Sequence, residues 1–193
     1  MEVGVAMRLF VAIELDRRLK DSLSGVQSRL REFDGDVRWT GPEQMHLTVK
    51  FLGEVPNDQV EVVCGAAATV ARGVEPFEIA LGPCGCFPPR GRVRIVQVGT
   101  VDEAGCVARC HELCEQAYEE LGFPREQRAF TPHLTVGRVG EDRSNGRLRE
   151  RAEQIRPQPV KQRAEALCVV QTLLSKGGAQ YNNVVRHELG RTD

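Results

Sequence analysis

One tetrapeptide occurs twice in this chain and constrains its fold more than any other feature. His-Leu-Thr-Val stands at residues 46–49 and again at residues 133–136, and the two copies hold two of the four histidines. In a β-strand, residues i and i+2 point to the same face. Each copy therefore presents an imidazole and a hydroxyl together, while its Leu and Val face the core. The sequence predicts two equivalent strands, each carrying one histidine–threonine pair.

A second pair of residues recurs at nearly the same distance and indicates an internal duplication. Asp16 and Asp102 are placed to cap helices and lie 86 residues apart, and the two motif histidines lie 87 residues apart. The strongest break in the chain is Pro88-Pro89-Arg90-Gly91, which we take as the boundary between the halves. We expect one bilobal domain over residues 1–193, with halves at about 7–88 and about 91–189.

Hydrophobic periodicity and turn residues predict strands interleaved with helices. The predicted strands cover residues 7–15, 37–40, 46–52, 77–87, 93–99, 133–138, 166–174 and 180–189. The predicted helices cover residues 16–32, 57–71, 102–121 and 147–155, and Lys176-Gly177-Gly178 forms the last turn. This order predicts an α+β fold with pseudo-two-fold symmetry, in which each lobe is an antiparallel sheet with helices on its outer face and the active-site cleft lies between the lobes. A doubly wound parallel sheet is the alternative, but no glycine-rich strand-to-helix turn supports it.

Charge and hydropathy exclude several classes of protein. The chain has 26 Lys and Arg against 27 Asp and Glu, for a net charge of -1, so no overall field attracts nucleic acid or a membrane surface. The longest apolar run, Leu9 to Ile13, is far too short to span a bilayer, and no secretion signal opens the chain. We expect a cytoplasmic monomer without a membrane partner.

Seven cysteines, an odd number, indicate reduced thiols rather than a disulfide framework. A metal site is the more specific alternative, because Cys106, Cys110, His111 and Cys114 are close in sequence. However, the i, i+4, i+8 spacing of the three cysteines also forms one stripe of a helix, and this favours core packing. We therefore expect neither a metal nor a cofactor.

The two histidine–threonine pairs suit phosphate chemistry. Histidine changes protonation near neutral pH, so one histidine can protonate a leaving oxygen while the other takes a proton from water. The threonine hydroxyls can donate hydrogen bonds to the non-bridging phosphate oxygens. Arg138 and Lys50 follow the motifs and could also hold phosphate, or could be strand-end surface charges; we favour phosphate binding for Arg138 and a surface role for Lys50.

These motifs and their flanks resemble the two-histidine (2H) phosphoesterases, and in detail the RNA 2',3'-cyclic phosphodiesterase branch, also called 2'-5' RNA ligase-like. The resemblance rests on residues 46–55 (HLTVKFLGEV), residues 131–138 (TPHLTVGR), the opening strand 7–15 (MRLFVAIEL), and Leu174-Ser175 with Gly178 and Tyr181 near the end. Met7 aligns with the usual start, so residues 1–6 are expected to be a short extension or an alternative start.

The resemblance implies a mechanism and a substrate. His46 would be the proton donor and His133 the proton acceptor, while Thr48, Thr135 and Arg138 would grip the cyclic phosphate. The implied reaction opens a 2',3'-cyclic phosphate at an RNA 3' end, tRNA halves among the candidates, and leaves a 2'-phosphate. In the reverse direction, a cyclic end and a 5'-hydroxyl would join in a 2'-5' bond. Small nucleotides are further candidate ligands.

Several alternatives remain open at this point. Other activities of the same superfamily would act on 2'-5' oligoadenylate or on small cyclic nucleotides. An RNA-end binding module without catalysis and a Cys/His metal protein are rivals of other classes. Residues 138–163 hold eight Lys/Arg and four Asp/Glu, and this basic segment could meet RNA phosphates or could be only a solvated helix face.

Overall fold

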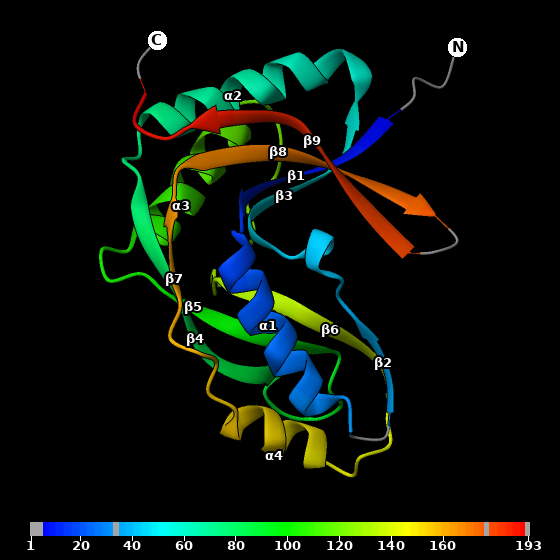
Figure 1. Cartoon of the computed structure of the whole chain (residues 1–193). Helices are drawn as coiled ribbons and strands as arrows, with labels where there is room; N and C mark the ends of the chain where they lie inside the picture. Colours follow the sequence, from blue (N-terminus) through cyan, green and yellow to red (C-terminus); the bar gives the residue numbers. More distant parts are fainter. Residues whose placement is uncertain (1–5, 33–34, 176–177, 192–193) are drawn as a thin grey trace.

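The computed structural model describes residues 6–32, 35–175 and 178–191, and it shows two antiparallel sheets (Figure 1). Sheet A has the order β3-β1-β8-β9, formed by His46–Pro56, Ala6–Glu14, Ala166–Ser175 and Gly178–Glu188. Sheet B has the order β2-β6-β5-β4-β7, formed by Gly35–Trp39, His133–Asp142, Ile95–Val101, Phe77–Phe87 and Lys161–Ala164. The predicted α+β class is confirmed, and each sheet carries one motif strand.

Each sheet is covered by two helices. Helices α2 (Val60–Arg72) and α3 (Cys106–Glu119) pack on sheet A, and helices α1 (Arg17–Leu30) and α4 (Arg147–Gln154) pack on sheet B. Two short 3₁₀ helices, η1 (Pro42–Gln44) and η2 (Asn57–Gln59), precede β3 and α2. The faces between sheets and helices share one continuous apolar core. Within the described residues, no helix is both long and apolar enough to cross a bilayer.

The lobes do not coincide with the two halves of the sequence. Apart from β2, β7 and β9, both halves have the same order, β1-α1-β3-α2-β4 and then β5-α3-β6-α4-β8. In each sheet, the motif strand pairs with the first strand of its own half, and that first strand pairs on its other side with the strand that follows the second helix of the opposite half in this order: β8 pairs with β1, and β4 pairs with β5. The break at residues 88–91 therefore divides the sequence but not the sheets. The matching order supports the duplication, which stays a prediction.

The helix starts show which local signals the fold uses. The Asp16 side chain accepts a hydrogen bond from Leu19 N at 2.8 Å and caps α1 as predicted. The Asp102 side chain accepts one from Val107 N at 2.6 Å, yet α3 begins only at residue 106, because Gly105 before it adopts a positive φ of 68°. A 3₁₀ turn likewise occupies residues 57–59, and α2 begins after it.

Other boundaries differ from the prediction because sheet pairing extends or adds strands. β3 and β6 run to Pro56 and Asp142, beyond the predicted ends. The four-residue strand β7 was not predicted, since its sequence Lys-Gln-Arg-Ala has no clear strand pattern; it forms by pairing with β4 at the sheet edge. Residues 176 and 177 of the predicted last turn lie outside the described residues, although Ser175 pairs with Gly178 as a hairpin requires.

The cysteine stripe of α3 belongs to the core. Cys110 and Cys114 are fully buried, and Cys106 packs partly buried against the same cluster. All seven cysteines are free thiols. The core-packing interpretation is thus confirmed, and no group of three or more potential metal ligands occurs among the described residues.

Candidate active site

The first histidine–threonine pair lies on β3, on the face of sheet A that is turned away from its helices. His46 and Thr48 are half-buried there, whereas Leu47 and Val49 between and after them are fully buried in the core. His46 pairs with Glu14 of β1, and Thr48 pairs with Ala12. The alternation predicted from the sequence is confirmed for this strand.

The second pair lies on β6 in sheet B with the same arrangement. His133 and Thr135 are half-buried, and Leu134 and Val136 are buried. β3 and β6 approach each other where the two sheets meet. The fold thus brings both motif strands, 87 residues apart in sequence, to one region of the molecule.

Both histidines are held by the backbone of the residue two positions earlier. His133 Nδ1 lies 2.8 Å from Thr131 O, and His46 forms a hydrogen bond with the backbone of Gln44. A carbonyl oxygen only accepts, so Nδ1 of His133 must carry a proton and donate it. The neutral His133 ring then has its lone pair on Nε2, the atom that can accept a proton.

A β-bulge follows the threonine in each motif strand and changes which side chains face the site. On β3, Thr48 pairs with Ala12 and Lys50 with Val11, so Val49 is the extra residue. On β6, Thr135 pairs with Gln97 and Gly137 with Val96, so Val136 is the extra residue. A bulge shifts the alternation of side chains by one residue. As a result, the fifth residue after each histidine faces the same side as that histidine.

Arg138 and Phe51 occupy these corresponding fifth positions. Arg138 is exposed on the face that carries His133 and Thr135, as phosphate binding requires, although strict alternation along the strand would turn it to the opposite face. Phe51 is 72% exposed, and its ring lies 6.1 Å from that of Phe10 on the same face of sheet A. Sequence reasoning missed Phe51, although its offset from His46 equals that of Arg138 from His133 and could have identified it.

Aromatic side chains surround His46 and change its pKa. The ring of Phe10 lies 4.6 Å from that of His46, and Tyr181 of β9 meets His46 edge-on at 4.9 Å. Burial among these groups lowers the pKa of His46 to about 4; the backbone hydrogen bond at Gln44 opposes this shift, and the charge of Arg138 adds to it. Arg138 stands on β6, so this opposing positive charge comes from the other sheet.

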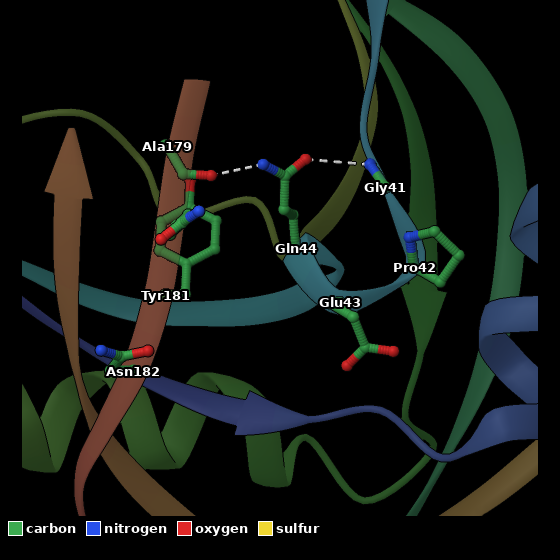
Figure 2. A pocket seen from close by; sticks show the side chains of 8 residues that line it. Gly41, Pro42, Glu43, Gln44, Ala179, Tyr181 and Asn182 are labelled. Carbon is green, nitrogen blue, oxygen red and sulfur yellow. Dashed lines mark hydrogen bonds between the residues drawn. The ribbon is translucent and has the colours of Figure 1, made fainter. Parts of the chain in front are cut away.

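Two adjoining hollows open beside His46. The larger has a volume of about 570 Å³ and is lined by His46, residues of β1, β8 and β9, and Lys20 of α1 from the other lobe. The smaller, of about 430 Å³, lies between η1 and β9, and the two share Glu43, Tyr181 and Asn182 (Figure 2). A cleft therefore runs along sheet A past the first histidine.

Gln44 fixes the loop that leads into His46. Its side-chain oxygen accepts a hydrogen bond from Gly41 N at 2.9 Å, and its Nε2 donates to Ala179 O of β9 (Figure 2). Gln44 therefore ties η1 to the strand that carries Tyr181. Sequence reasoning did not single out this residue, since nothing local marks a glutamine that bonds a strand 135 residues away.

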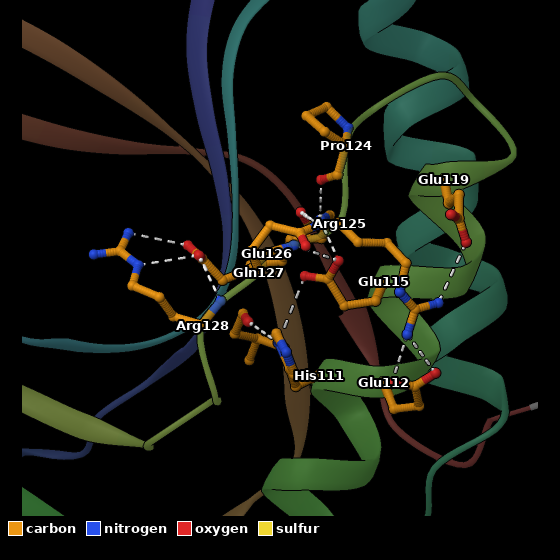
Figure 3. Close-up of polar contacts among 11 residues, drawn as sticks. His111, Glu112, Glu115, Glu119, Pro124, Arg125, Glu126, Gln127 and Arg128 are labelled. Atoms are coloured by element: carbon orange, nitrogen blue, oxygen red, sulfur yellow. Dashed lines mark hydrogen bonds and ion pairs between the residues drawn. The ribbon is translucent and has the colours of Figure 1, made fainter.

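Lys50 does not face the site. It is 4% exposed, because the bulge at Val49 turns it into the core, where Lys50 Nζ lies 2.9 Å from Glu115 Oε2 and donates to Pro124 O at 3.1 Å. Figure 3 shows the surrounding polar contacts of α3 with residues 124–128. Neither phosphate binding nor a surface position is therefore correct for Lys50; it is one half of a buried ion pair.

The basic segment that could have met RNA lies mainly away from the cleft. Helix α4 packs against β4 and α1, on the helix-covered side of sheet B (Figure 1). Arg149 donates to Pro88 O and Gly91 O at 2.9 Å and holds that loop, while Arg143 pairs with Glu141 at 2.8 Å. These contacts favour the interpretation as a solvated helix face with local structural roles.

Comparison with known proteins identifies the family. The family model described as LigT like Phosphoesterase matches residues 13–96 and 99–181, which is most of the chain. The chain belongs to this family. The resemblance seen in the motifs is thus confirmed, and both histidine–threonine pairs lie inside the matched segments.

Curated relatives of this LigT-like phosphoesterase have a consistent name. The RNA 2',3'-cyclic phosphodiesterase of Methanothermobacter thermautotrophicus is 34% identical over 144 residues, covering 75% of this chain and 77% of the relative. That of Archaeoglobus fulgidus is 35% identical over 133 residues, covering 69% and 73%. The protein is therefore a member of an enzyme family of phosphoesterases.

Solved structures confirm the fold of this LigT-like phosphoesterase. TT0787 of Thermus thermophilus aligns with a TM-score of 0.78 at 27% identity, covering 95% of this chain and 98% of that one. E. coli LigT complexed with 3'-AMP aligns with a TM-score of 0.76 at 20% identity, covering 96% and 99%. The bilobal arrangement of two antiparallel sheets is thus shared across nearly the whole chain.

Proposed function

We propose that this protein hydrolyses 2',3'-cyclic phosphate ends of RNA to 2'-phosphate ends by acid–base catalysis with His46 and His133, without a metal ion. The observation that carries the proposal is the pair of identical histidine–threonine motifs on two strands that approach each other from separate sheets. The names of the curated relatives supply the substrate class. The candidate substrates are 2',3'-cyclic phosphate ends on tRNA halves and, as a second class, small cyclic nucleotides.

His133 takes the part of the general base. Its Nδ1–H is committed to Thr131 O, so its Nε2 is the atom that accepts the proton of the attacking water. Water adds to phosphorus, the bond from phosphorus to the 3' oxygen breaks, and the phosphate stays on the 2' oxygen. The proton of the water goes to His133 as the new bond forms.

His46 takes the part of the general acid and gives a proton to the departing 3' oxygen. With a pKa of about 4, His46 is neutral near pH 7 in the free protein, and the acid role requires the substrate to change this. The anionic phosphodiester supplies that change, because a negative charge beside an imidazole raises its pKa and offsets the effect of Arg138. Substrate binding and protonation of His46 are thus coupled.

Thr48, Thr135 and Arg138 bind the phosphate in this proposal. The hydroxyls stand two residues from each histidine on the same strand face, and the bulge on β6 brings Arg138 onto that face as well. Hydrogen bonds from these groups stabilise the charge that gathers on the non-bridging oxygens during the reaction. Proton transfer and charge stabilisation are then both supplied by side chains, and no Lewis acid is needed.

An exposed aromatic ring favours RNA over a small phosphate ester as the substrate. Phe51 is largely exposed on the site face, and its ring lies beside that of the buried Phe10, which in turn lies beside His46. Proteins that bind single-stranded RNA use such rings to stack bases. The same site could run the reverse reaction, in which a cyclic end and a 5'-hydroxyl give a 2'-5' bond.

The first test is turnover of a short oligoribonucleotide with a 2',3'-cyclic phosphate end. We expect a 2'-phosphate product, and we expect His46→Ala and His133→Ala each to lower kcat by roughly 100-fold or more while both variants stay folded. Near-normal rates in either variant would remove that histidine from the mechanism. A preference for 2'-5' oligoadenylate over the cyclic end would favour the alternative activity.

The pH profile of kcat/KM, which reports the free enzyme, separates the two roles. Both histidines act in one turnover in opposite protonation states, so the wild-type profile is bell-shaped whichever of them is the acid. If His46 is the acid, His46→Ala loses the limb on which kcat/KM falls as the pH rises; if His46 is the base, the variant loses the limb on which kcat/KM rises. The limb that His46→Ala removes therefore decides whether the assigned roles hold or are exchanged.

A further inference from the structure

We infer that Gln27 and His111 are positioning residues of the two motifs, each holding the bulge that follows one threonine. The two side chains come from helices α1 and α3, which take equivalent places in the two halves of the chain. Neither belongs to a motif, and neither faces the cleft. This inference rests on the proposed function and extends it to the backbone that supports the site.

The bulge on β6 is held by Gln27. Gln27 is buried, and its Nε2 donates to Val136 O at 2.8 Å and to Thr40 O at 2.7 Å. Val136 O also accepts a hydrogen bond from Thr40 N at 3.0 Å. Val136 is the extra residue of the bulge and has no Cα partner in β5, and its carbonyl is held by Gln27 Nε2 and by the N–H of Thr40, the residue that follows β2.

The bulge on β3 is held in the same way by His111. Its Nδ1 lies 2.8 Å from the carbonyl oxygen of Val49, the extra residue of that bulge, so Nδ1 is the donor. The His111 ring stacks on Phe130 at 3.9 Å with an interplanar angle of 8°, three residues before His133 (Figure 3 labels His111). His111 therefore contacts both the first motif strand and the segment that enters the second.

The bulges decide which side chains reach the site. A strand without the extra residue would turn Arg138 toward the core and Lys50 toward the cleft, because one residue of shift exchanges the two faces. Removing His111 takes away the side-chain donor to Val49 O, and removing Gln27 leaves Val136 O with the N–H of Thr40 alone, so either change favours a rearranged strand. Displacement by about 1 Å is enough to lower a rate by up to about 100-fold. The two side chains thus act on catalysis through the strands they hold.

His111 offers a test that separates the hydrogen bond from the stacked ring. His111→Phe keeps a ring against Phe130 but has no donor, whereas His111→Asn keeps a donor near the position of Nδ1 but has no ring. We expect kcat to fall by about 10-fold in His111→Phe with little change in KM, and to recover in His111→Asn.

Tyr118→Phe is the matched control for His111→Phe. Tyr118 lies on the same helix, is buried, and donates to Val63 O of α2 at 3.1 Å, so this variant also removes one donor to a backbone carbonyl. We expect its kcat to stay within about twofold of the wild type even where its melting temperature falls. The inference is overturned for β3 if His111→Phe and Tyr118→Phe change kcat equally.

Gln27 is tested through Arg138 by measuring the binding of a nucleoside 2'-monophosphate with calorimetry. We expect Gln27→Met and Arg138→Ala each to weaken binding, and the double variant to bind no more weakly than Arg138→Ala alone, since Gln27 acts through the placement of Arg138. Additive losses would contradict this, as would unchanged affinity in Gln27→Met.

A crystal structure of Gln27→Met tests the role of Gln27 without measuring turnover or ligand binding. We expect Arg138 to be displaced or the extra residue at Val136 to be lost from the pairing with β5. An unchanged bulge with Arg138 in place would overturn the inference for β6. Absence of turnover in the wild type would instead refute only the proposed function.

Discussion

The buried ion pair between Lys50 and Glu115 offers a sharp test of the energetics of this fold. The two side chains are 2% and 3% exposed, and their charged atoms lie 2.9 Å apart. Lys50 Nζ also donates to Pro124 O, and Glu115 Oε2 accepts from Glu126 N at 3.1 Å. The pair thereby joins β3, α3 and the segment that leads toward β6.

Lys50→Met keeps most of the apolar length of the side chain but leaves the Glu115 carboxylate buried without its counter-ion. Breaking a buried pair in this way typically costs about 3–5 kcal/mol of unfolding free energy. In a domain of this size, each kcal/mol lowers the melting temperature by about 2–4 °C, so we expect a decrease of roughly 6–20 °C. Urea unfolding followed by circular dichroism gives the free energy directly.

The double variant Lys50→Met/Glu115→Leu distinguishes a lost interaction from a lone buried charge. With both charges removed, we expect it to be more stable than Lys50→Met, because apolar replacements of buried pairs are often tolerated. Asp21→Asn is the surface control: it breaks the exposed pair with Arg17, at 3.8 Å, and should cost at most about 0.5 kcal/mol. A loss below about 1 kcal/mol in Lys50→Met, or additive losses in the double variant, would refute the reasoning.

Three further predictions follow from the site. Activity should persist in EDTA; loss of turnover that a divalent ion restores would show that a metal is required. Because the pKa of His46 is about 4 in the folded chain against 6.5 unfolded, the unfolded chain binds the extra proton, so stability should be full above pH 6.5 and fall toward pH 4 by up to about 3 kcal/mol. His46→Gln should weaken this dependence of stability on pH. If urea unfolding gives both proteins the same change in unfolding free energy between pH 6.5 and pH 4, the assignment is contradicted. Phe51→Ala should raise KM for a cyclic-ended oligonucleotide several-fold, with less effect on a cyclic mononucleotide; equal effects on both would argue against base stacking.

Local signals in the sequence were sufficient for most of the elements and for the family. Asp16 caps its helix because one side chain suffices to satisfy an N–H three residues on. The cysteine stripe of α3 reaches the core because helical periodicity alone sets its face. By contrast, β7 could not be predicted, since its four residues become a strand only by pairing with β4.

The sequence by itself determined that two identical strands each carry a histidine and a threonine on one face, because the two-residue period of a strand is local. Only the tertiary structure decided which residues beyond the threonines join them. The bulges at Val49 and Val136 exist because neighbouring strands and the helix residues His111 and Gln27 accommodate one extra residue there. They turn Lys50 inward and Phe51 outward, which strict alternation along β3 does not predict. The exchange of β4 and β8 between the sheets has the same origin, since strand pairing is chosen between segments distant in sequence, where no local pattern records the partner.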